Sequence, residues 1–302
     1  MLSDSQFPQH ELDLYIQNQK QKLQVNLQKN DILSRKEFAH SLFGNTAYGV
    51  DIQAKHYDEL KREDLVDYFK AAYTPNNCTI IVSGKFDEES LNLLNQQFGN
   101  NWASCDAVVN KFTFEDSNKQ YVYKERPEAI QSAIRIGKIA VNRKHEDFPG
   151  LQILNTVLGG YFGSRLMNNI REDKGYTYGI GSGISSLQDA GYLFIATEVG
   201  AEVCADALIE IYKEIELLKT ELVGEEELTL VKNYMLGSML GSLENIFSHA
   251  DKFKNLHFFG LDYDYYDRYI NKVKSITAEE IRDLAKKYLT TEEFTEVVVG
   301  KK

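Results

Sequence analysis

The sequence predicts an α+β fold in which antiparallel sheets are packed by helices, built as two related domains of which the first is incomplete. Two patterns support this prediction. Stretches with helical periodicity alternate with short β-branched runs that are typical of strands. A segment near residue 65 also reappears near residue 281, which indicates an internal repeat. At 302 residues, the chain is long enough for two domains with separate cores.

The composition is typical of a soluble globular protein, with 43% apolar and 26% charged residues. The net charge of −11 and the absence of Lys/Arg clusters disfavour a nucleic-acid partner. No apolar run is long enough to span a membrane, and we expect no membrane partner. The compartment, cytoplasmic or periplasmic, stays open. Three widely spaced cysteines indicate neither a disulfide framework nor a thiolate metal site.

Periodicity then assigns each element in order. In the first part it predicts helices at about 9–29, 31–43, 60–73 and 87–98, and a strand at 78–84. In the second part it predicts strands near 119–124, 129–138, 176–186, 190–199 and 294–299. Helices are expected near 148–158, 164–172, 202–219, 224–258 (broken), 263–273 and 278–288. Gly159 and Gly160 are expected to lie just past a helix C-terminus, and Thr277-x-x-Glu280 is a capping box.

The internal repeat aligns two segments without a gap. LVDYFKAAYTPNNCTIIVSGK (65–85) matches IRDLAKKYLTTEEFTEVVVGK (281–301) at one constant offset in residue number. Identities include Asp67 with Asp283 and Gly84 with Gly300. Both copies are read as a helix, a turn and a strand that ends in glycine. The same offset aligns Phe43-Gly44 with Phe259-Gly260, so the sequence predicts a duplication.

The repeat also predicts where the domains divide. The second copy begins near Cys105, after a polar linker at about 100–106. We therefore expect a second domain at 105–302, preceded by the C-terminal half of a first domain at 1–104. The same offset places the start of the first copy ahead of Met1, together with the counterpart of residues 158–183.

Residues 158–183, LGGYFGSRLMNNIREDKGYTYGIGSG, hold the candidate functional residues. Arg171 ends a short helix, Gly175 makes a tight turn, and Tyr178 lies seven residues beyond Arg171 on a strand. A guanidinium and a phenol near one turn are two donors that can face a peptide carbonyl. The alternative is an aromatic, half-buried strand with an arginine that answers the helix dipole.

No complete catalytic set is found elsewhere. His56-Tyr57-Asp58-Glu59-Leu60 approaches a His-x-x-Glu-His zinc site, but Leu60 stands where the second imidazole is required. We therefore interpret His56 as a loop residue. Gly159–Gly163 lacks the Lys-Ser/Thr of a phosphate loop, and no Gly-x-Ser-x-Gly elbow is present.

The motifs Leu158-Gly159-Gly160, Ser164-Arg165-Leu166 and Arg171 to Tyr178 resemble the insulinase/pitrilysin family of zinc metallopeptidases, which includes the mitochondrial processing peptidases. The resemblance covers essentially the whole chain. It implies processing-peptidase-like domains that pair around a peptide chamber. It further implies that Arg171 holds a substrate carbonyl and that Tyr178 donates to the oxyanion. Gly159, Gly160 and Ser164 fall in the substrate loop.

The chain departs from this family at the zinc site. The His-x-x-Glu-His motif is absent, and Lys22 falls about where the family has a downstream glutamate ligand. A lysine supplies no carboxylate and its charge opposes a metal cation. Glu11 is a weaker alternative for that position. The sequence therefore predicts no metal ligand in this chain and zinc on a catalytic partner.

Three functions follow from the resemblance. The leading one is a non-catalytic subunit that completes a peptide chamber, with a catalytic zinc-peptidase homologue as hetero-oligomeric partner, or a second copy as self-dimer, and a peptide as substrate. In this role Arg171 and Tyr178 act on substrate held at the partner's zinc. The second is a fragment of a self-sufficient zinc endopeptidase. The third is a catalytically dead scaffold that binds peptides.

Overall fold

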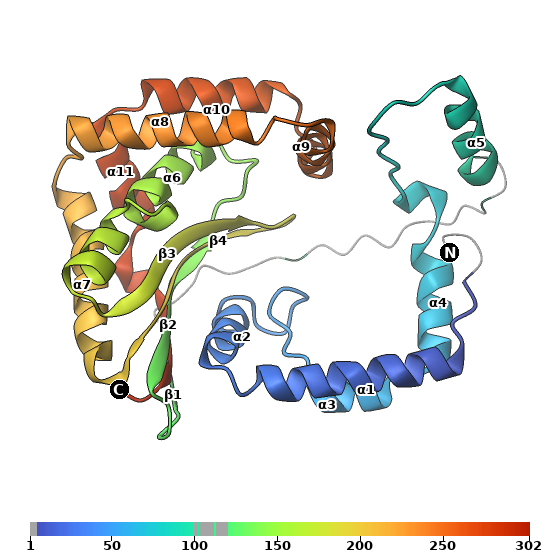
Figure 1. Ribbon diagram of the computed structural model, residues 1–302, viewed down its shortest axis with the longest axis horizontal. Coiled ribbons are helices and arrows are strands. Elements are labelled where there is room, and N and C mark those ends of the chain that lie inside the picture. The colour runs from blue at the N-terminus through green and yellow to red at the C-terminus, as the bar shows by residue number, and fades with distance from the viewer. Residues whose placement is uncertain (1–4, 100–101, 103–111, 113–119) are drawn as a thin grey trace. The chain divides into compact units, whose positions relative to one another are not determined.

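The computed structural model describes residues 5–99, 102, 112 and 120–302 (Figure 1). The chain divides into two compact units. Unit 1 comprises Met1–Asn26, Ile52–Lys111 and Leu243–Lys254, and unit 2 comprises Leu27–Asp51, Phe112–Ser242 and Asn255–Lys302. The boundary predicted between residues 104 and 105 lies outside the described residues.

Unit 2 is built on a five-stranded sheet with the order β1-β5-β2-β4-β3. β1 runs parallel to β5, and the other neighbouring pairs are antiparallel. The sheet is therefore mixed rather than purely antiparallel, and the predicted α+β class is confirmed. All five strands predicted for the second part form: β1 (Gln120–Glu125), β2 (Gln131–Ala140), β3 (Thr177–Ser186), β4 (Gly191–Gly200) and β5 (Thr295–Gly300).

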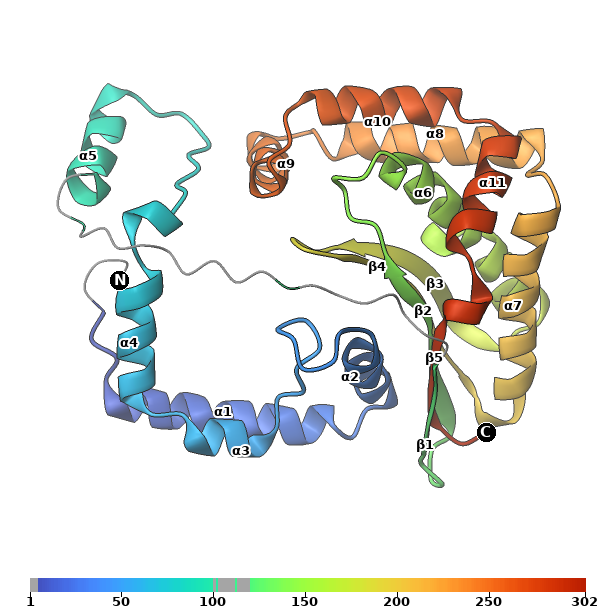
Figure 2. The same ribbon diagram turned by 180° about the vertical axis from the view of Figure 1, so that it is seen from behind.

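Helices cover one face of this sheet and enclose the main core (Figures 1 and 2). Alternate residues of the strands, such as Ile134 and Ile136 of β2, point into it. The helix predicted at 202–219 also has apolar residues at helical spacing, and these are all buried: Cys204, Leu208, Ile211, Ile215 and Leu218. The helices of unit 2 on this side are α6 (Phe148–Asn155), α7 (Cys204–Thr220), α8 (Glu225–Gly241), α10 (Asp264–Ser275) and α11 (Ala278–Tyr288).

The opposite face of the sheet carries a second, smaller core. Phe38, Leu42 and Phe43 of α2 (Asn30–Phe43) pack there against Val297 and Val299 of β5. A strand buried on both faces reads as a continuous apolar run, which explains the sequence TEVVVG of β5.

Unit 1 is helical in the residues that the structure describes. Its helices α1 and α3 lie side by side (Figure 1). The Lys20 ammonium of α1 pairs with the Asp58 carboxylate of α3 at 2.5 Å. None of the helices in the described part of the chain is long and apolar enough to cross a membrane. The helices are α1 (Gln9–Asn26), α3 (Ala54–Glu59), α4 (Arg62–Ala72), α5 (Glu88–Phe98) and most of α9 (Ile246–Phe259).

The structure reproduces several helices of the internal repeat. When the residue numbers of the first copy are shifted by the offset of the sequence repeat, the first and last residues of α2 coincide with those of α9. The first and last residues of α4 likewise coincide with those of α11. Gly44 and Gly260 end the first pair of helices with φ of 57° and 65°, positive values that glycine adopts without a steric cost. A positive φ at equivalent positions supports the predicted duplication.

The two copies also exchange equivalent helices. Residues 27–51 of the first copy belong to unit 2, whereas residues 243–254 of the second copy belong to unit 1. The two segments begin at Leu27 and Leu243, which the repeat aligns with each other. Each compact unit therefore contains a helix from the other copy.

The strand predicted at 78–84 does not form. These residues have no regular secondary structure, and Ile80 and Val82 are exposed. The equivalent residues of the second copy form β5, which has β1 on one side and β2 on the other. No strand lies beside 78–84 within the described ranges, and a strand requires a neighbour for its backbone donors and acceptors.

Candidate functional site

The candidate segment is built from two π-helical turns, a loop and a strand. The turns are η2 (Thr156–Gly160) and η3 (Met167–Asp173), and β3 follows. The prediction that Gly159 and Gly160 lie beyond a helix C-terminus is therefore wrong, because α6 continues into η2. Side-chain periodicity does not distinguish π from α turns over so few residues, and π turns are frequent at functional sites.

Glycines set the course of the backbone through this segment. A Cβ on Gly159 would lie 2.7 Å from the backbone nitrogen of Ser182 in β3, so only glycine allows η2 to approach the strand this closely. Gly175 has a φ of 66°, as the predicted tight turn requires. Together they bring η3 back beside the start of β3.

Arg171 contacts two aromatic rings. Its Cζ is 4.6 Å from the ring centroid of Phe162 and 5.3 Å from that of Tyr178, distances typical of cation–π contacts. Its Nε also lies 3.4 Å from a carboxylate oxygen of Glu172. No hydrogen bond from its guanidinium to a described residue is found, so the edge of the group is available to a ligand.

Tyr178 is presented by an irregularity of the edge strand. The register between β3 and β4 shifts between Thr177 and Ile180, and such bulges redirect side chains at the rims of sites. The Thr177 hydroxyl donates to the carbonyl of Glu198 at 2.6 Å and accepts from the Gly179 backbone N–H at 3.1 Å. The Tyr178 side chain is consequently 89% exposed.

Thr197 of β4 completes this support. Its hydroxyl lies 3.0 Å from both the Thr177 hydroxyl and the Gly179 carbonyl, and the residue itself is buried. Two threonines from adjacent strands therefore hold the shape of the strand where Tyr178 leaves it.

Side-chain pairs anchor the helical part of the segment. Arg165 binds Glu227 of α8 through two hydrogen bonds of 2.8 Å, and this bidentate pairing raises the pKa of the Arg165 guanidinium. The Asn169 amide donates to Glu210 and Glu214 of α7 at 2.9 and 2.7 Å. Its hydrogen bond lowers the pKa of Glu210.

The predicted site residues occupy different environments. Arg171 and Tyr178 are brought together, whereas Gly159 and Ser164 are buried and Gly160 is exposed. The Ser164 hydroxyl oxygen has no hydrogen-bond partner among the described residues. A role of Gly159, Gly160 and Ser164 in a substrate loop stays a prediction.

Sequence reasoning missed Phe162 and Thr197. Phe162 is 64% exposed. The only sequence feature that could have pointed to it is a large apolar side chain between two glycines of the segment. Thr197 had none, because its contact with Thr177 depends on the register of β3 and β4.

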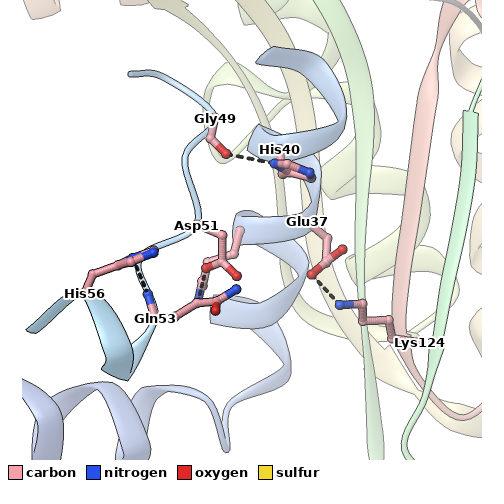
Figure 3. Close-up of polar contacts among 8 residues, drawn as sticks. Glu37, His40, Gly49, Asp51, Gln53, His56 and Lys124 are labelled. Carbon is pink, nitrogen blue, oxygen red and sulfur yellow. Dashed lines mark hydrogen bonds and ion pairs between the residues drawn. The ribbon is translucent and has the colours of Figure 1, made fainter. Parts of the chain in front are cut away.

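His56, which opens the near match to a zinc motif, and His40 both make local contacts (Figure 3). His56 lies in the one-turn helix α3, so its prediction as a loop residue is wrong: the Gln53 backbone N–H donates to its Nδ1 at 3.1 Å and begins the helix. An imidazole that accepts at Nδ1 carries its proton at Nε2 when neutral, which leaves no lone pair for a metal. His40 donates from Nδ1 to the Gly49 carbonyl at 3.1 Å, because a carbonyl only accepts.

Zinc therefore does not fit the residues present. Within the described ranges, no three His, Cys, Asp or Glu side chains are grouped as a metal requires. Lys22 is exposed on α1, and Glu11 faces His10 at 3.8 Å. What the site offers chemically is a pair of hydrogen-bond donors, one of them charged, for a carbonyl or a carboxylate.

Comparison with known proteins identifies relatives of the chain. A family model described as the peptidase M16 inactive domain matches residues 59–235. A Bacillus subtilis protein named uncharacterized zinc protease YmxG is 27% identical over 90% of this chain and 64% of its own length. A Helicobacter pylori protein named non-peptidase homolog YmxG is 24% identical over 89% of this chain and 62% of its own.

A solved structure shares the fold. The crystal structure of a peptidase M16 inactive domain from Pseudomonas fluorescens superimposes with a TM-score of 0.90 at 22% identity, covering 100% of this chain and 73% of that one. The chain spans less than two thirds of the length of the curated relatives it matches.

Proposed function

Because this chain belongs to the peptidase M16 family through its inactive domain, we propose that it is a non-catalytic subunit that completes the peptide chamber of a zinc peptidase. Arg171 and Tyr178 then contact a substrate held at the zinc of a catalytic homologue. A self-dimer is the alternative assembly. The relative named zinc protease supports the family, and the relative named non-peptidase homolog also supports the loss of chemistry.

The observation that carries this proposal is the presentation of Arg171 and Tyr178. Two aromatic rings contact the Arg171 guanidinium, and apart from the ion pair of its Nε with Glu172 at 3.4 Å its hydrogen-bonding edge is unused among the described residues. The Tyr178 hydroxyl has no hydrogen-bond partner among the described residues, and its ring is almost fully exposed. A pair used only for packing would bury the phenol, whereas donors intended for a ligand are held in place and left open.

The two donors have different tasks. The partner's zinc supplies the Lewis-acid chemistry. Arg171 binds a carbonyl oxygen of the substrate backbone and thereby fixes the register of the peptide. The Tyr178 hydroxyl donates to the carbonyl oxygen on which negative charge develops during attack, and the loss of one such donor typically costs ~10²–10³ in rate.

The direct test is to mix the protein with a homologue from the same organism that retains His-x-x-Glu-His, and to measure cleavage of a peptide library. We expect little cleavage by either protein alone and a marked increase for the mixture. Unchanged cleavage together with an absence of complex formation would contradict the proposal.

The two alternatives give different results in the same assay. A self-sufficient peptidase would cleave without the homologue, once zinc is added, and would lose this activity with a chelator. A peptide-binding scaffold would bind library peptides without increasing cleavage by any homologue.

A further inference from the structure

A pocket lies in unit 2, on the face of the sheet opposite the main core. It has a volume of about 540 Å³ and opens between α2, the loop that follows it, and strands β2, β3 and β4. Volumes of this size are typical of sites for small ligands or a few residues of a peptide. We call it the Arg135 pocket. Neither Arg171 nor Tyr178 lines it.

The charged residues that line the Arg135 pocket are all cationic: Arg35 and Lys36 from α2, and Arg135 from β2. Lys36 is neutralised by Asp51, whose carboxylate oxygen lies 2.5 Å from the Lys36 ammonium. Neither arginine has a hydrogen bond or an ion pair with a described residue. In a chain with a net charge of −11, two arginines without an ion-paired carboxylate at one pocket are an unusual concentration of positive charge.

Arg135 is the deeper of the two arginines. Its Nε is buried and has no hydrogen-bond partner among the described residues. Burial, followed by repulsion from Arg35, lowers the pKa of its guanidinium, and the weaker attraction of Asp31 and Glu198 does not offset this. A buried polar donor without a partner is costly, and an anion placed between the arginines would remove both the unmet hydrogen bond and the repulsion.

Aromatic and aliphatic side chains form most of the remaining wall. The Phe194 ring lies 6.0 Å from the Arg135 Cζ, and the Tyr192 ring lies 5.8 Å from that of Phe194. Gly183 of β3 leaves room for this arrangement, because a Cβ there would lie 2.7 Å from the Phe194 ring. The site therefore combines a cationic end with an apolar surface.

We propose that the Arg135 pocket binds a peptide through a carboxylate that stands beside an apolar side chain. Arg135 and Arg35 hold the carboxylate oxygens, as guanidinium groups do in bidentate pairs. The apolar side chain packs on Phe194 and Tyr192. This inference goes beyond the proposed function, because binding here requires neither a catalytic partner nor cleavage.

Titration calorimetry with three peptides tests the proposal. The probes are acetyl-Ala-Ala-Phe with a free C-terminus, the same peptide as its C-terminal amide, and acetyl-Ala-Glu-Phe-amide. We expect binding of at least one carboxylate-bearing peptide and at least about tenfold weaker binding of the neutral amide. Comparing the first and third peptides distinguishes a C-terminal carboxylate from a glutamate side chain.

Variants of the pocket sharpen the result. Arg135→Gln should weaken binding of the preferred peptide by about tenfold or more. Arg35→Gln should weaken it too, and because Arg35 is exposed on α2, this variant keeps the test valid should Arg135→Gln fail to fold. Arg268→Gln is the matched control, since it removes one charge from an exposed arginine outside the pocket.

Two outcomes would overturn the proposal. One is equal affinity for the three peptides, which would show that the carboxylate is not recognised. The other is unchanged affinity in both Arg35→Gln and Arg135→Gln, which would place the binding elsewhere.

Discussion

Arg171 illustrates how a single residue is positioned by aromatic rings while most of its hydrogen-bonding edge stays unused, since only its Nε faces a carboxylate, that of Glu172 at 3.4 Å. Carboxylate pairs fix a guanidinium through its hydrogen-bonding edge, whereas the rings of Phe162 and Tyr178 contact its faces. Such contacts contribute about 0.5–1 kcal/mol at exposed sites, enough to bias the side chain toward one arrangement. The rest of the edge stays available to a ligand.

Gly159 is the residue on which the local backbone most depends. In Gly159→Ala the new methyl group would meet the Ser182 backbone at 2.7 Å and a Leu166 methyl at 2.9 Å. We expect a loss of about 1–3 kcal/mol in the free energy of unfolding, measured by chemical denaturation. Gly237→Ala is the control: it lies inside α8 with nothing within 4 Å, and should stabilise the protein slightly.

The candidate residues were only partly visible in the sequence. Arg171, Gly175 and Tyr178 are close along the chain, so local spacing predicted their proximity. Arg135 and Phe194 are distant in the sequence, and they face one pocket because Gly137 of β2 pairs with Phe194 of β4. A cation on a predicted strand does not reveal which partners the sheet register will give it.

At the scale of elements, periodicity predicted most helices and strands of unit 2 to within a few residues. The failures share a cause, since the deciding interactions lie outside the local sequence. The 78–84 segment has the pattern of β5 but lacks its neighbours. The turns at η2 and η3 differ from α turns in hydrogen bonding and not in residue pattern.

The helices α4 and α11 begin at equivalent positions of the repeat, but the hydrogen bonds that cap their N-termini differ. The Thr277 hydroxyl accepts from the Glu280 backbone N–H at 3.2 Å, and Glu280 accepts from the Thr277 N–H at 3.1 Å. At the equivalent start, Asp64 accepts from the Lys61 backbone N–H at 2.9 Å, but a lysine side chain accepts nothing in return.

This difference predicts unequal effects of alanine at the two caps. Thr277→Ala should cost about 1 kcal/mol, read from amide hydrogen exchange in the first turn of α11. Lys61→Ala removes no capping bond and should leave exchange in the first turn of α4 nearly unchanged. Equal effects at both positions would contradict this assignment of the caps.

A pH-dependent contact joins α11 to the start of α6. Burial acts to raise the pKa of Asp147, but hydrogen bonds from Lys287 and Tyr288, at 2.6 and 2.7 Å, outweigh it and lower the pKa overall. A carboxylate whose pKa is depressed on folding stabilises the protein above its unfolded pKa and loses this contribution as the pH falls through the folded pKa.

Asp147→Asn should therefore destabilise the protein in a pH-dependent way. We expect a cost of about 1–2 kcal/mol near pH 7, where the partly exposed pair is weakened by solvent. The cost should shrink as the pH falls below the ordinary value of 3.8. A difference from the native protein that stays constant between pH 7 and pH 3 would show that the charge of Asp147 does not matter.

The whole molecule is organised by its duplication. Unit 1 and unit 2 each contain a helix of the other copy, so neither copy is a compact unit by its own sequence alone. The repeat was readable in the sequence as a constant offset between equivalent residues. The exchange was not, because sequence similarity pairs equivalent segments without saying which ones pack together.

The proposed function makes one claim above all, that this chain contributes Arg171 and Tyr178 to substrate bound at another subunit. The claim is most directly tested by kcat for peptide cleavage by the reconstituted pair, with Arg171→Ala or Tyr178→Phe in this chain and an unaltered catalytic homologue. Arg268→Ala and Tyr68→Phe are matched controls, because both residues are exposed and lie outside the site. Complex formation is followed in parallel by size-exclusion chromatography.

We predict that Tyr178→Phe lowers kcat about 10²- to 10³-fold, that Arg171→Ala lowers it as well, and that both variants still form the complex. The two controls should retain the kcat of the native pair. An unchanged kcat in both Arg171→Ala and Tyr178→Phe, in a pair that assembles and cleaves normally, would contradict the account.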